Sequence, residues 1–206
     1  MDTKYYILLI ILGFIAPALM EKRTKESLHI AQLEGYEYDH YLKWLKNNKD
    51  KAYSLKKNNQ PVKMPLVMTN RAKRLYNANY IINIIFFFIL AILSISILPN
   101  YVDLIVMLVV LGILYYLQPM IIALATFVME PIEKRINMGF YLSAQNKIKA
   151  REDLKVVGIT GSFGKTSTKF IIGAILEGKF NVLNTPESYN TPMGLSKVIN
   201  NELNND

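Results

Sequence analysis

Residues 75–129 read LYNANYIINIIFFFILAILSISILPNYVDLIVMLVVLGILYYLQPMIIALATFVM, and Asp103 is the only charged side chain among them. A helix that crosses a bilayer needs about 20 mainly apolar residues. The stretch therefore predicts two spans, at about residues 80–98 and 104–129. A third uncharged run, at residues 5–20, predicts another span near the N-terminus. We expect this part of the chain to be an α-helical membrane region with three transmembrane helices.

The composition agrees with a membrane protein. Of the 206 residues, 51% are hydrophobic and only 19% are charged, and the mean hydropathy is +0.18. A soluble domain has about 25% charged residues, so a wholly soluble protein is excluded. The chain has no cysteine, which excludes a disulfide scaffold, a cysteine-ligated metal and a thiol nucleophile.

The net charge of +8 is concentrated in residues 21–79, which hold 13 Lys or Arg against 6 Asp or Glu. Such a basic segment, with its tyrosines, is one way to bind single-stranded nucleic acid. Basic residues beside membrane spans also mark the cytoplasmic side and lie near anionic lipid headgroups. Because predicted spans flank this segment on both sides, we expect membrane lipid, and no nucleic acid, as its partner.

The same charges predict the orientation of the spans. Basic residues follow the first and third spans, whereas the loop at residues 99–103 has none, so the N-terminus is expected outside and the remainder after residue 129 in the cytoplasm. The alternative is a cleaved signal peptide at residues 1–18, but its beginning is hardly basic. The residues that set the orientation are Lys22, Arg23, Lys25, Lys134, Arg135, Lys147, Lys149 and Arg151.

Prolines and aromatic residues punctuate the membrane region. Pro119 should kink the third span, and Pro131 suits the first turn of a linker helix at about residues 130–153. Tyr38, Tyr41, Leu42 and Leu45 form an apolar stripe at helical spacing, with Trp44 nearby. Two interpretations of these aromatic residues are open: anchors at the lipid headgroups, or the core of a small subdomain.

The pattern changes after the linker. Residues 154–160 and 180–183 have the composition of short buried strands, and residues 166–177 that of a helix. Thr191 and Pro192 suit the N-cap and first position of a further helix. The order strand, Gly-rich turn, helix, strand, helix predicts that residues 154–206 are the incomplete beginning of a parallel α/β P-loop ATP-binding domain.

The Gly-rich turn is the most informative motif. Backbone N–H groups of such a turn, together with the positive end of the next helix, bind phosphate. Lys165 is the candidate catalytic residue, with its ammonium at the β- and γ-phosphates, and the Thr166 hydroxyl is a candidate Mg²⁺ ligand. The alternative is a tight turn with a surface lysine. The candidate ATP-binding residues are Gly161, Ser162, Phe163, Gly164, Lys165, Thr166 and Ser167.

The spacing departs from the common P-loop rule, and the form T-G-S-x-G-K-T-S-T-K resembles the ATP loop of the Mur ligases. A second stretch, Thr185-Pro186-Glu187-Ser188-Tyr189-Asn190-Thr191-Pro192-Met193-Gly194, resembles a segment that in this family lies near the γ-phosphate and the acceptor. The resemblance makes Asn190 and Thr191 candidate substrate residues. It covers about a quarter of the chain and is greatest to the branch that adds D-Ala-D-Ala, in particular to its membrane-anchored members.

The resemblance implies an ATP- and Mg²⁺-dependent ligase of peptidoglycan precursor synthesis in a bacterial cell membrane. ATP would phosphorylate the carboxylate of a UDP-MurNAc-peptide to an acyl phosphate, which an amino acid or D-Ala-D-Ala then attacks. We expect these 206 residues, as an N-terminal part, to be inactive alone. The alternatives are a membrane-anchored ATP-binding scaffold and an NTPase without ligase activity; the aspartate that a Walker-type NTPase carries after an apolar strand does not appear before Asp206.

Overall fold

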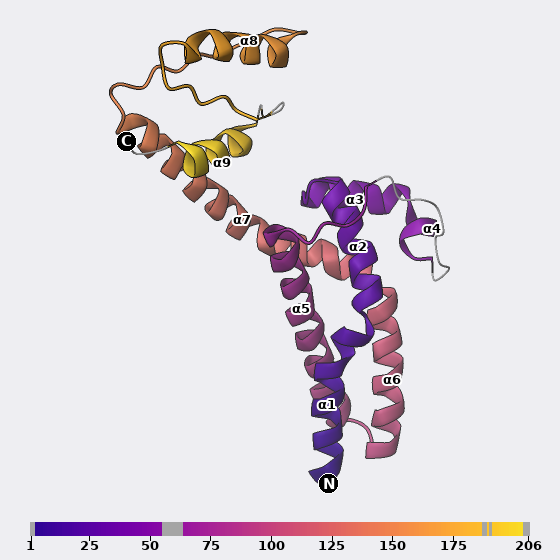
Figure 1. The fold of residues 1–206 in the computed structure, drawn as a ribbon. Helices are drawn as coiled ribbons and strands as arrows, with labels where there is room; N and C mark the ends of the chain where they lie inside the picture. The colour runs from indigo at the N-terminus through magenta and orange to yellow at the C-terminus, as the bar shows by residue number, and fades with distance from the viewer. Residues whose placement is uncertain (1–2, 55–63, 187–188, 190, 204–206) are drawn as a thin grey trace. The chain divides into compact units, whose positions relative to one another are not determined.

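The computed structural model describes residues 3–54, 64–186, 189 and 191–203 (Figure 1). The chain divides into two compact units, Met1–Ile132 and Glu133–Asp206. The boundary lies within one long helix, α7, which contributes its first half to the first unit and its second half to the second unit. Each unit is described by itself.

The secondary-structure elements in the described part of the first unit are all α-helices. α5 packs against both α1 and α6, and α2 packs against α5 as well (Figure 1). The helices are α1 (Thr3–Leu19), α2 (Glu21–Leu33), α3 (Tyr38–Asn47), α4 (Lys49–Ala52), α5 (Asn70–Ile95), α6 (Asn100–Tyr116) and the beginning of α7 (Gln118–Lys149).

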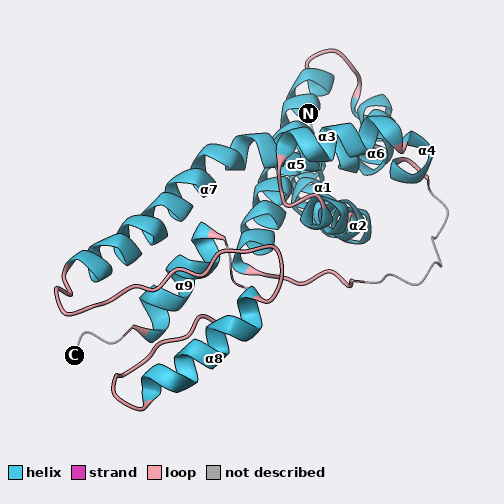
Figure 2. Ribbon diagram, turned by 90° about the horizontal axis from the view of Figure 1, so that it is seen from above, coloured by secondary structure: helices cyan, strands magenta, loops and turns pink. Residues whose placement is uncertain are grey.

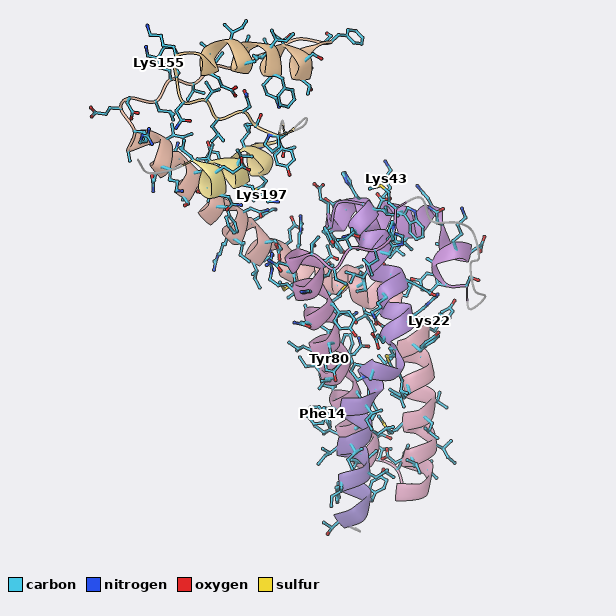
Figure 3. All side chains as sticks on the ribbon, in the orientation of Figure 1. Phe14, Lys22, Lys43, Tyr80, Lys155 and Lys197 are labelled. Atoms are coloured by element: carbon cyan, nitrogen blue, oxygen red, sulfur yellow. The ribbon has the colours of Figure 1, made fainter. Side chains whose placement is uncertain are left out.

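The bundle of α1, α5 and α6 has an apolar exterior and a mainly apolar interior. Its interior includes Leu9 of α1, Phe87 of α5 and Met107 of α6. Its outer side chains, such as Ile85 and Ile105, are exposed. Tyr80 of α5 donates a hydrogen bond to the Phe14 carbonyl of α1 at 3.1 Å (Figure 3). A helix that is hydrophobic all round is typical of a membrane span.

A second apolar cluster forms where α2, α3, α5 and α7 meet. Tyr41 and Leu45 are buried in it, and Trp44 packs against it partly buried. Of the two interpretations of the aromatic residues, the structure supports the core of a small subdomain. Burial raises the pKa of the Tyr41 hydroxyl, which donates a hydrogen bond to the Pro119 carbonyl at 3.2 Å.

The helices change direction at two breaks, one between α1 and α2 and the other between α6 and α7. Buried polar side chains connect the two breaks, and we call them the polar layer: Thr24, Asn79, Asn83 and Gln118. Gln118 donates to Asn83 Oδ1 at 2.7 Å and accepts from the Thr24 hydroxyl at 3.1 Å. The Gln118 amide also donates to Met20 Sδ at 3.1 Å. Met20 lies at the break between α1 and α2, and Gln118 begins α7, so the layer connects the two breaks.

The helices change direction at these breaks. α1 and α2 meet at 45°, and α6 and α7 meet at 68° with only Leu117 between them. The kink predicted at Pro119 is thus confirmed, because α7 begins at Gln118. Among the helices of the described residues, α5 alone has the length and composition to cross a membrane, and up to three spans result if each bent pair counts as one.

Two expectations about helix boundaries are wrong. Pro131 does not open a new helix but lies inside α7, which continues through it although Pro131 has no N–H to donate. The linker helix therefore begins much earlier than residue 130. Asp103 is not in a loop: α6 begins at Asn100, and Asp103 is fully buried in its first turn.

The second unit contains the end of α7 with α8 (Lys165–Glu177) and α9 (Pro192–Glu202). The expected parallel α/β domain is not observed, since the described part of residues 133–206 has no strand (Figure 2). Val156 and Val157 are exposed rather than buried. A parallel strand is stabilised by neighbouring strands and by helices on both faces. The described segments at 154–160 and 180–183 have no paired neighbour, so neither becomes a strand.

Candidate phosphate-binding site

Two glycines determine the shape of the loop before α8. Gly164 is the N-cap of α8 and has a φ of 75°, and Gly161 has a φ of 153°. These values lie in the region that residues with a Cβ rarely adopt. The Gly164 carbonyl accepts the first helical hydrogen bond, from Thr168 N at 2.8 Å. The glycines therefore allow the chain to turn directly from the loop into the helix.

Lys165 lies where the loop and the helix join. Its ammonium folds back over the loop and donates a hydrogen bond to the Gly161 carbonyl. All seven candidate ATP-binding residues, from Gly161 to Ser167, are exposed, and the Phe163 side chain is 95% exposed. The loop, Lys165 and the first turn of α8 are thus accessible together. An anion that displaced the Gly161 carbonyl oxygen would contact the Lys165 ammonium.

The first turn of α8 has the properties of an anion site. Its N-terminal N–H groups lack intrahelical acceptors and carry the positive end of the helix dipole. Thr166 and Ser167 lie on this turn, exposed. In the described part of the chain, no group of three or more His, Cys, Asp or Glu is placed to hold a metal.

The second candidate segment ends in a well-formed helix start. The Thr191 hydroxyl accepts a hydrogen bond from Gly194 N at 3.1 Å, and Pro192 occupies the first helical position. The predicted N-cap is therefore confirmed. Asn190, the other candidate substrate residue, lies outside the described residues. A Cβ at Gly194 would contact the Tyr189 ring at 3.4 Å, so the ring lies close to the new helix.

Lys169, which is not among the candidate residues predicted from the sequence, joins the two candidate segments. Lys169, one turn after Lys165, donates to the Thr185 carbonyl and lies 3.3 Å from the Thr185 hydroxyl. Gly173, one turn further, packs against the Asn184 side chain. Lys169 is the last residue of the first motif and Thr185 is the first residue of the second. Their positions in the two motifs are the sequence signal that could have indicated this contact.

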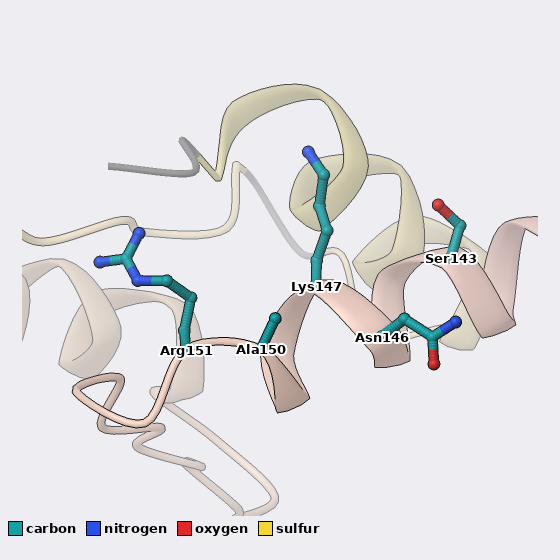
Figure 4. A pocket seen from close by; sticks show the side chains of 5 residues that line it. All are labelled: Ser143, Asn146, Lys147, Ala150 and Arg151. Carbon is teal, nitrogen blue, oxygen red and sulfur yellow. The ribbon is translucent and has the colours of Figure 1, made fainter.

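α9 is held against the end of α7 by hydrogen bonds. Lys147 donates to the carbonyls of Asn200 and Leu203, at 2.9 and 3.3 Å, and Asn200 donates to the Phe140 carbonyl at 2.9 Å. An open hollow over this end of α7 is lined by Ser143, Asn146, Lys147, Ala150 and Arg151 (Figure 4). None of the candidate ATP-binding residues lines it.

The comparison with known proteins concerns the same part of the chain. Residues 159–206, which include the loop, α8 and α9, match the Mur ligase middle domain. This part of the chain is therefore similar to the Mur ligases. A UDP-N-acetylmuramoyl-tripeptide–D-alanyl-D-alanine ligase from Synechocystis sp. is 41% identical over 49 residues.

The Mur ligase match is partial. The aligned residues make up 24% of this chain and 11% of the Synechocystis ligase, so the chain spans only a small part of that relative's length. No solved structure matches the chain. The first unit, with its helical bundle, lies outside the matched residues.

Proposed function

We propose that the chain is part of a membrane-anchored, ATP-dependent Mur-type ligase that joins an amine to a peptide carboxylate in peptidoglycan precursor synthesis. The observation that carries the proposal is the junction at Gly164 and Lys165, inside the matched residues. There a left-handed glycine, an exposed helix start and a lysine ammonium occupy the same short segment. This combination is the one that phosphate binding requires.

The residues divide the work as follows. The backbone N–H groups of the loop from Gly161 to Gly164 bind phosphate oxygens, and Lys165 exchanges its bond to the Gly161 carbonyl for the β- and γ-phosphates. The Thr166 hydroxyl contributes one ligand to Mg²⁺. ATP, when bound, supplies the phosphoryl group that activates the carboxylate. Lys169 keeps Thr185 at α8, which holds the second segment near the loop.

The substrates are proposed from the relative. Its name indicates a UDP-MurNAc-tripeptide and D-Ala-D-Ala, so we propose a UDP-MurNAc-peptide as the source of the carboxylate and D-Ala-D-Ala or an amino acid as the amine. The Thr191 hydroxyl is engaged in the helix cap. We therefore assign Thr191 the shaping of this segment and Asn190 the contact with substrate.

The membrane placement is supported by the first unit. The bundle of α1, α5 and α6 has an apolar exterior. α5 has the length and composition of a membrane span, and α1 and α6 pack along it. We propose that the N-terminus lies outside a bacterial cell membrane and that the ATP-binding part lies in the cytoplasm.

Substitution of Lys165 tests the ATP site. A charge-assisted hydrogen bond contributes about 1.5–3 kcal/mol, so Lys165→Ala should weaken ATP binding to the full chain by roughly tenfold to a hundredfold, at 1.4 kcal/mol per decade. Binding is measured by calorimetric titration of the detergent-solubilised chain with ATP and Mg²⁺.

Lys179→Ala provides the matched control, because Lys179 is an exposed lysine just past the other end of α8. It should leave the affinity unchanged. Equal affinity of wild type and Lys165→Ala would remove the basis of the proposed ATP site. Equal weakening by both substitutions would show that only the overall charge matters.

A further inference from the structure

The first half of α7, residues 118–132, has an unusual position in the first unit. It follows α6 after a single residue, and the axis of α7 (Gln118–Lys149) departs from that of α6 (Val102–Tyr116) by 68°. If α6 crosses the bilayer, this half of α7 runs much more along the membrane surface than through the membrane. The sequence alone predicted one span over residues 104–129. Because of the bend, the second half of that run, from Gln118 onward, need not follow α6 through the hydrocarbon core.

One face of this helix is fixed inside the protein. Ile122, Ala123 and Ala125 are buried in the cluster shared with α2, α3 and α5, and Ile121 is buried in the cluster of the bundle. Gln118 is fully buried in the polar layer. The helix is therefore held in place by contacts on one side and cannot turn that side toward lipid.

The opposite face is apolar and exposed. Met120 is 45%, Leu124 38%, Phe127 57% and Val128 48% exposed. Their spacing of three, four and eight residues places them on one side of a helix. The Phe127 ring also packs against Tyr38 at 5.2 Å between centroids, which leaves Met120, Leu124 and Val128 as the open part of this face.

This face continues the outer surface of the bundle. Ile113 and Tyr116 on α6 are exposed, as is Leu117 at the break, so apolar side chains continue from α6 onto α7 without a polar residue between. The polar layer lies at the same break, and charged residues begin immediately beyond the corresponding break of α1, at Glu21 and Lys22. The break between α1 and α2 thus marks the level at which charged side chains begin, and the polar layer connects the break between α6 and α7 to it.

We propose that residues 118–132 form an interfacial helix, whose face of Met120, Leu124 and Val128 rests in the boundary between headgroups and acyl chains. The occupant of the face is lipid, because the surface it continues is the lipid-facing surface of the bundle. An apolar helix face of this kind typically lies about 5–10 Å into the boundary. The inference rests on the membrane placement proposed above and is independent of the ATP site.

Nitroxide labels on single introduced cysteines test the position, since the chain has no cysteine of its own. Met120→Cys, Leu124→Cys and Val128→Cys are prepared in the full chain, reconstituted in vesicles of phosphatidylcholine and phosphatidylglycerol. Depth is measured from the relative accessibility of each label to oxygen and to a water-soluble nickel chelate. Ile113→Cys on α6 and Lys43→Cys on α3 serve as the lipid and aqueous references.

All three labels should be shallow and at similar depth. Residues 120 and 128 are about 12 Å apart along a helix, and a bend of 68° reduces the change in depth to roughly 4–5 Å if α6 stands along the bilayer normal. A change of about 12 Å would show that α7 continues through the membrane, and water-exposed labels would show a protein-facing or free surface. Either result overturns the inference. A water-exposed label at Ile113 overturns the membrane placement as well.

Discussion

Gln118 connects the two bends of the first unit through one buried amide. Its side chain bonds to Thr24 of α2, Asn83 of α5 and the sulfur of Met20. Each buried donor or acceptor that is left without a hydrogen-bond partner lowers the free energy of unfolding by about 1–3 kcal/mol. The angle at which α7 leaves α6 is therefore fixed by a side chain as well as by Pro119.

Gln118→Leu should lower the stability of the first unit. The substitution roughly keeps the volume but leaves Asn83 Oδ1 without this donor, whereas the Thr24 hydroxyl keeps Asn79 Oδ1 as a second acceptor at 3.4 Å. We therefore expect a loss of about 1–3 kcal/mol, the cost of one unsatisfied group. Thermal unfolding in detergent, followed by circular dichroism, measures it. Gln145→Leu, at a half-exposed position on the same helix, should unfold like wild type; identical midpoints for all three proteins would contradict the role of Gln118.

Sequence reasoning predicted the bend but not this residue. A proline acts on its own helix, so its effect can be read locally. The hydrogen bonds of Gln118 reach 94 residues back to Thr24 and 35 residues back to Asn83. Only the packing of α2 and α5 beside α7 brings these groups together, and no local pattern contains that information.

At the scale of elements, α8 depends on a close contact with the segment that follows it. Gly173 is buried on α8, and a Cβ added there would lie 2.6 Å from Asn184 Oδ1. With Lys169 and Thr185 one turn away, this contact holds the segment at residues 184–185 along the helix. The close contact with Asn184 therefore requires glycine at position 173, although alanine would make the helix itself more stable.

Exchange of Gly173 should have opposite effects in two backgrounds. Gly173→Ala alone should destabilise the contact by about 1 kcal/mol or more, because the Asn184 side chain must move away. In an Asn184→Ala background the same exchange should stabilise α8 by about 0.5–1 kcal/mol, the usual gain from replacing a helical glycine. Hydrogen exchange of the amides of residues 165–186 measures both. The same sign in both backgrounds would show that the contact does not form.

The two helices α8 and α9 of the second unit were predicted correctly, whereas the two predicted strands are not observed in its described residues. α8 and α9 were expected because a glycine loop, a threonine N-cap and Pro192 are local signals. Residues 154–160 have the composition of a strand, but a strand also needs a paired neighbour, and composition does not show whether one is present. For the candidate site, the loop was found from its motif, whereas the bond between Lys169 and Thr185 needed the structure.

At the scale of the whole molecule, the distribution of charge predicts the orientation of the bundle. The basic residues of the predicted cytoplasmic loop, residues 21–79, account for nearly all of the net charge of +8, and the connection between α5 and α6 has no Lys or Arg. Positive loops stay in the cytoplasm, so the two ends of the bundle should face opposite sides.

Impermeant thiol reagents test this orientation in intact cells. Asn100→Cys, at the start of α6, should be labelled from outside, and Lys43→Cys, exposed on α3, should be labelled only after the cells are permeabilised. Permeabilised cells control for reactivity at both positions. The reverse pattern would mean that the bundle is inserted the other way round, with the candidate ATP-binding residues outside the cell.

α1 and α6 have the same length, 17 residues each. Each is therefore about 25 Å long at 1.5 Å per residue, a few ångströms less than the hydrocarbon thickness of about 30 Å in a typical bilayer. α5, with 26 residues, can accommodate this difference by tilting, but the two shorter helices cannot. Hydrophobic mismatch of this kind is relieved by local thinning of the bilayer or by short-chain lipids gathering around the bundle. In the proposed membrane placement, the lengths of these helices would thus select the lipid composition around the bundle.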